Sequence, residues 1–97
     1  HHRNVNDIIQ AHLLGLKWTI FSTLGKNATG LCSHPIETVR RVTYDDFNAK
    51  KLFGAMEDVY RDRDRSTDSI THYIAGITFD YFHGAQCQKE DLRKGRA

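Results

Sequence analysis

The sequence predicts an all-α fold, a small bundle of about four helices in a single domain spanning residues 1–97. Apolar residues recur at spacings of three and four in four segments, which is the pattern of amphipathic helices. Polar capping residues, glycines and the only proline stand between these segments. Residues that favour strands gather only at 41–44 and 77–81, and both stretches fit the helical spacing better.

The first helix is predicted from Asp7 to Leu24, with Asn4 or Asn6 as its N-cap and Gly25 as its end. One stripe of apolar residues follows its length at helical spacing, and we expect this helix to be the spine of the core. The stripe consists of Ile9, Leu13, Leu16, Ile20 and Leu24, widened by Ile8, Trp18 and Phe21.

A short second helix is predicted to begin at Pro35, because proline suits the first turn of a helix. His34 or Ser33 would be its N-cap, and Glu37 would complement the positive end of the helix dipole. Its apolar side is formed by Ile36, Val39 and Val42, and Arg40 and Arg41 point away from that side.

The third helix begins after a capping-box pattern at residues 43–46, unless the second helix runs straight on. A fourth helix is predicted with Asp68 as its cap and an end at residues 83–84. The segments 1–5 and 86–97 are expected to be flexible ends. The third stripe is Ala49, Leu52, Phe53, Met56, Val59 and Tyr60, and the fourth is Ile70, Ile74, Ile77 and Tyr81.

The composition predicts a soluble, cytoplasmic protein without a membrane span, since 27% of its residues are charged and no run approaches 20 apolar residues. Two cysteines, Cys32 and Cys87, do not make a disulfide scaffold. Unpaired thiols are the favoured interpretation, with one disulfide as the open alternative. No cofactor and no metal site is predicted, because His72, Asp80 and His83 share a helix face but lie too far apart for one ion.

The segment from Ser33 to Val42 resembles the recognition helix of helix-turn-helix transcription regulators. That resemblance implies a preceding helix over residues 25–32 and nucleic-acid binding, with arginines that read guanine or contact phosphate. The nucleic-acid-binding candidates are Thr38, Arg40, Arg41, Lys50 and Lys51.

The same segment is also similar to the P-x-[DE]-x-x-[KR] signature of mitochondrial carriers, carried here by Pro35, Glu37 and Arg40. In that family the proline kinks a membrane helix. The preceding helix in this chain includes Lys17, and charges at membrane depth are costly, so we interpret this similarity as a coincidence.

Arg65 and His72 have a spacing that is similar to the R-x(4–6)-H pair of a family of helical, metal-independent ribonucleases. In that interpretation the arginine stabilises charge on phosphorus and the histidine transfers a proton. The favoured interpretation is different: a non-enzymatic helical binding module, a protein-interaction or self-associating regulatory protein. Its partner would be another protein or a second copy, and nucleic acid is the alternative partner. The aromatic residues Tyr73, Phe79 and Phe82 of the fourth helix are the predicted partner-binding residues.

Overall fold

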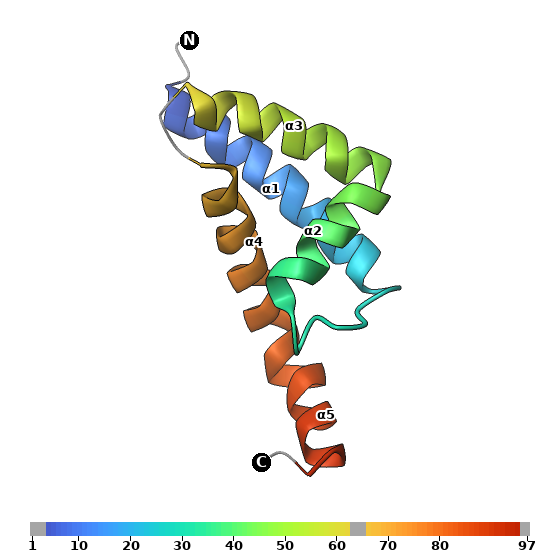
Figure 1. Cartoon of the computed structure of the whole chain (residues 1–97). Coiled ribbons are helices and arrows are strands. Elements are labelled where there is room, and N and C mark those ends of the chain that lie inside the picture. Colours follow the sequence, from blue (N-terminus) through green and yellow to red (C-terminus); the bar gives the residue numbers. More distant parts are fainter. Residues whose placement is uncertain (1–3, 63–65, 96–97) are drawn as a thin grey trace.

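The structure, a computed structural model, describes residues 4–62 and 66–95, and every regular element in that part of the chain is helical. The predicted small all-α bundle is confirmed. No helix in these residues is long and apolar enough to cross a membrane. The elements are α1 (Val5–Leu24), α2 (Pro35–Asp45), α3 (Phe47–Arg61), α4 (Thr67–Phe82), a π-helical turn η1 (His83–Cys87) and α5 (Gln88–Arg93), and Figure 1 shows their arrangement.

Helix α1 is the spine of the core. The side chain of Asn4 caps it by accepting a hydrogen bond from the backbone N–H of Asp7 at 2.9 Å. All five residues of the predicted stripe are buried. Trp18 was expected to widen that stripe, and this prediction is wrong, because its side chain is 74% exposed. At about 100° per residue, Trp18 lies roughly 200° from both Leu16 and Ile20 and therefore faces away from the core.

Asp46 joins α2 to α3. It ends the first of these helices and caps the second, since its carboxylate accepts a 2.9 Å hydrogen bond from the N–H of Ala49. The same carboxylate accepts a 2.9 Å bond from the Thr23 hydroxyl of α1. The predicted capping box at residues 43–46 is thus placed wrongly. Thr43 is buried within α2, and its hydroxyl donates to the carbonyl oxygen of Val39.

The cap of α4 is Ser66, whose hydroxyl accepts from the N–H of Ser69 at 3.3 Å, and not the predicted Asp68. Ile70 and Ile74 of the predicted stripe are buried. Tyr81, which was assigned to the same stripe, is 67% exposed. It lies in the last turn of α4, where Phe21 of α1 covers one side of its ring.

The predicted end at residues 83–84 is wrong, because the chain continues through the π-helical turn into α5. The N–H of Gln88 bonds to the carbonyl oxygen of His83, five residues back. This turn contains one residue more than a turn of α-helix. The side chains that follow are therefore rotated about the helix axis by about 100° relative to an uninterrupted α-helix. Helices α4 and α5 form one rod with this turn, and the molecule measures 52 × 23 × 23 Å (Figure 1).

Cys32 and Cys87 form a disulfide, with a Cα–Cα distance of 5.5 Å, so the expectation of unpaired thiols is wrong. The two cysteines lie 55 residues apart in the sequence, and this separation does not indicate that they pair. Two local features produce it. Leu31 is fully buried and anchors the connection before α2 to the core. The π-helical turn directs Cys87 toward the core. In a regular α-helix, Cys87 would instead lie about 140° around the helix axis from Phe82.

Candidate functional site

One exposed apolar surface of the described residues is formed by side chains of α1 and α4. Four large side chains there are half or more exposed: Leu14 at 57%, Trp18 at 74%, Tyr73 at 50% and Tyr81 at 67%. We call these four residues the α1–α4 face. Leu14 and Trp18 stand one turn apart on α1, so they lie on the same side of that helix. A surface of this composition marks an interaction site more often than a solvated one.

Ring contacts join the two halves of the α1–α4 face. Phe21 of α1 stacks on Tyr81 of α4, with 4.9 Å between the ring centroids. Its other neighbour on α4 is Phe82, which meets it edge-on at 6.3 Å. The ammonium group of Lys17 lies 5.5 Å from the centroid of the Phe21 ring. Stacked rings hold side chains in place, so this part of the face is preorganised.

A shallow groove of about 50 Å³ runs between the two helices beside these rings. Leu14 and Lys17 line it from α1, and Tyr73, Ile74 and Ile77 line it from α4. The α1–α4 face therefore includes a small depression, and Trp18 follows its lining residue Leu14 by one turn on α1. A hollow of this size can accept a methyl-sized group from a partner.

The structure places the three predicted partner-binding residues on different surfaces. Tyr73 belongs to the α1–α4 face. Phe82 packs against the core and is partly buried. Phe79 lies two residues, or about 200°, from Tyr81 and contacts the ring of His83 at 4.9 Å, so it faces another direction. Sequence reasoning missed Leu14 and Trp18, although their positions around the helix, well away from the buried stripe, could have indicated them.

The predicted nucleic-acid-binding residues are also dispersed. Thr38 is buried, so it cannot reach a partner. Arg40 forms an ion pair with Asp68 of α4. Arg41 donates a 2.6 Å hydrogen bond to the backbone carbonyl of Thr29. Both arginines thus connect α2 to neighbouring segments. The acceptors in these contacts are Asp68 and Thr29, and not the nearby acidic residues Glu37, Asp45 and Asp46.

Lys50 lies 5.5 Å from the ring centroid of Tyr44, and Lys51 is exposed on α3. Lys50 and Arg40 line one pocket of about 260 Å³ between α2 and α3, together with Tyr44, Phe53 and Glu57. The helix that the helix-turn-helix resemblance requires over residues 25–32 does not form. Those residues instead make a series of turns.

Of the predicted ribonuclease pair, His72 is exposed on α4, and its Nδ1 lies 2.7 Å from the carbonyl oxygen of Asp68. Arg65 lies outside the described residues. Within residues 4–62 and 66–95, no three His, Cys, Asp or Glu side chains come close enough together to hold a metal ion.

Comparisons with known proteins add no assignment: no protein-family model matches the chain, and no curated protein or solved structure is significantly similar to it. The candidate site therefore rests on the chemistry and exposure of its own residues.

Proposed function

We propose that this chain is a self-associating helical module, and that the α1–α4 face is where a second copy of the chain docks. The observation that carries the proposal is the exposure of Leu14, Trp18, Tyr73 and Tyr81 along one seam. Aromatic anchors surrounded by smaller apolar contacts are typical of the centre of a protein–protein interface.

The area of the face supports this occupant. A fully exposed aromatic side chain offers about 150–250 Å² to a partner. At the observed exposures, the four side chains together present on the order of 500 Å². A standard interface buries about 800 Å² on each side. The face can thus supply the apolar centre of a dimer interface, and the polar residues around it can supply the rim.

Shape and charge also favour a second copy as the occupant. A twofold dimer needs a surface that is complementary to itself. The α1–α4 face carries exposed apolar side chains on both helices and a shallow groove between them, so the apolar side chains of two copies can pack against each other along it. The groove side carries Lys17 on α1, and Asp80 follows Tyr73 by two turns on α4. One charge of each sign lets two identical faces approach without net repulsion.

The test is a concentration series of the full chain by sedimentation equilibrium, from the micromolar to the millimolar range. Trp18 is the only tryptophan, so its fluorescence reports directly on the face. We expect the mass to rise from one copy to two, and we expect the tryptophan emission to move to shorter wavelength in parallel, since dimerisation removes the indole from water.

Two matched variants separate a specific interface from general stickiness. Leu14→Glu places a charge in the face, whereas Leu92→Glu makes the same change on α5, at a side chain that is 67% exposed. We expect Leu14→Glu to abolish the dimer and Leu92→Glu to leave it intact, with both melting temperatures close to that of the parent. A chain that stays monomeric at all concentrations, or a dimer that Leu14→Glu does not weaken, would overturn the proposal.

A further inference from the structure

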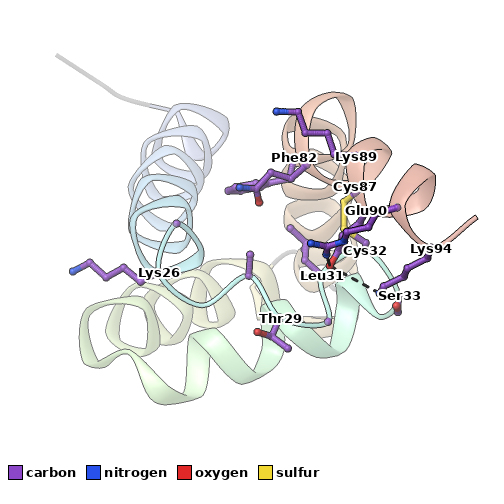
Figure 2. Close-up of a pocket in the computed structure, with 15 residues that line it drawn as sticks. Lys26, Thr29, Leu31, Cys32, Ser33, Phe82, Cys87, Lys89, Glu90 and Lys94 are labelled. Carbon is purple, nitrogen blue, oxygen red and sulfur yellow. Dashed lines mark ion pairs between the residues drawn. A yellow bond between two sulfur atoms is a disulfide. The ribbon is translucent and has the colours of Figure 1, made fainter.

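A second surface, separated from the α1–α4 face by the ring of Phe82, collects most of the unbalanced positive charge. It is a groove of about 600 Å³ between the connection 25–33 and the rod formed by α4, the π-helical turn and α5 (Figure 2). Four basic residues line it: Lys26, Lys89, Arg93 and Lys94, with Glu90 as the single acid. We call this the basic groove. Its net charge is +3, whereas the whole chain carries +2, so the rest of the chain is net −1.

The charges of the basic groove are only partly neutralised. Glu90 lies 3.7 Å from Arg93 and 3.9 Å from Lys94, so one carboxylate is shared between two cations (Figure 2). Lys26 and Lys89 have no ion-pair partner within residues 4–62 and 66–95. Cations gathered along a concave surface strengthen one another's field and attract multivalent anions.

The turns of the connection add uncharged donors. Among residues 28–33, only Leu31 uses its backbone N–H within the described part of the chain, in a bond to the carbonyl oxygen of Ala28. The N–H groups of Thr29, Gly30, Cys32 and Ser33 have no acceptor there, and all four residues line the groove. Successive free N–H groups in turns are a common way to bind phosphate.

The connection is held firmly enough to form a wall. Leu31 is buried in the core, and Arg41 bonds to the carbonyl oxygen of Thr29. The disulfide then ties Cys32 to Cys87 on the opposite wall. Gly30 adopts a φ of +87°, which favours glycine and shapes the turn. Donors on a fixed wall lose little freedom on binding, so the groove is preorganised.

We propose that the basic groove is a binding site for a small anion that carries two or more phosphate groups, either an inorganic polyphosphate or the polyphosphate part of a nucleotide. Its volume lies within the roughly 300–1,000 Å³ of pockets that hold small molecules. The lysines and Arg93 supply charge-assisted hydrogen bonds to phosphate oxygens. None of the four residues that define the α1–α4 face lines this site.

The test is a calorimetric titration of the oxidised full chain with sodium tripolyphosphate and, in a second arm, with adenosine triphosphate. Equal affinity in the two arms indicates that the phosphate chain alone is bound, and tighter binding of the nucleotide indicates that the base contacts the groove as well. In both arms we expect the amide signals of Gly30, Ser33 and Lys89 to move in nuclear magnetic resonance spectra. Added salt should weaken the binding, since the charges are exposed.

Matched pairs of variants assign the binding to the groove. Lys26→Gln with Lys89→Gln should weaken tripolyphosphate binding at least ten-fold. Lys50→Gln with Lys51→Gln changes the net charge equally on α3 and should alter it less than two-fold. All four lysines are exposed, so the melting temperatures should stay close to that of the parent.

A second pair of variants tests for a change of affinity in the opposite direction. Glu90→Gln releases Arg93 and Lys94 and should tighten binding several-fold. Asp58→Asn removes a carboxylate with the same spacing to an arginine, 3.8 Å from Arg61, and should have little effect. Three results would overturn the proposal. The first is that neither ligand binds at low salt. The second is that the two double-lysine variants lose the same amount of tripolyphosphate affinity, and the third is that the chain binds an oligonucleotide but not tripolyphosphate.

Discussion

Removing the disulfide between Cys32 and Cys87 is the sharpest test of the fold. The perturbation is reduction with dithiothreitol, or the double substitution Cys32→Ser with Cys87→Ser. The bond closes a loop of 55 residues. In the chain-entropy model, a loop of this length destabilises the unfolded state by about 4 kcal/mol relative to the open chain. Small domains have a total free energy of unfolding of only about 5–15 kcal/mol, so this bond supplies a large share of it.

The assay is thermal unfolding followed by far-ultraviolet circular dichroism, with and without reductant. For a domain of this size, each kcal/mol corresponds to about 4–8 °C in melting temperature. Reduction should therefore lower the melting temperature by about 15–30 °C. The double serine variant should melt near the reduced protein and should not respond to reductant.

The reasoning would be refuted in two ways. Mass spectrometry after alkylation could show two free thiols in the untreated protein, in which case the bond does not form. Alternatively, complete reduction could lower the melting temperature by less than about 4 °C, the equivalent of 1 kcal/mol. In that case the connection 25–33 is held by its buried leucine and by hydrogen bonds without the covalent link.

Four other substitutions test the packing, and thermal unfolding measures each. Leu16→Ala should cost about 2–5 kcal/mol, because it leaves a cavity in the fully buried stripe of α1. Gly54→Ala should stabilise α3 by up to about 1 kcal/mol, because an added Cβ there meets no atom within 4 Å. His12→Leu should raise the melting temperature, since the His12 Nδ1 is buried with no hydrogen-bond partner in the described structure. Hydrogen bonds from the N–H of Ala49 and the hydroxyl of Thr23 lower the pKa of Asp46 from its ordinary 3.8. The ionised carboxylate therefore stabilises the fold fully above pH 3.8. This stabilisation is lost as the pH falls through the lowered pKa, because the carboxylate is then protonated. Asp46→Asn should remove this part of the acid-induced loss.

The helices could be predicted from the sequence because their signals are local. The buried stripe of α1 depends only on the spacing of five residues along the helix. Asn4 and Pro35 mark helix starts by their own chemistry. The errors in the helix starts fell where two possible caps lie within a few residues of each other. Ser66 caps α4 in place of Asp68, which is drawn instead into an ion pair with Arg40 of α2.

The exposure of Leu14 and Trp18 could have been predicted from their helix positions, but the assembly of the candidate surfaces could not, because it depends on which elements lie side by side. Trp18 and Phe82 are both aromatic residues on helices, yet one is exposed and the other packs on the core. The position of Trp18 around α1 accounts for its exposure, whereas the burial of Phe82 depends on the packing of α4 against the core. The basic groove needs Lys26 and Lys89 on facing walls, and these residues lie more than 60 positions apart in the sequence.

The difference in helix length explains why both surfaces exist. Helix α1 has 20 residues and is about 30 Å long. The rod of α4, the π-helical turn and α5 has 16, 5 and 6 residues, which makes it about 40 Å long. The rod is therefore about 10 Å longer than α1. Beyond Tyr81, whose ring stacks on Phe21 near the end of α1, the connection 25–33 meets the rod at the disulfide. A loop buries little apolar area, so a covalent bond from Cys32 to Cys87 takes the place of a packed helix there, and the space that side chains leave unfilled is the basic groove.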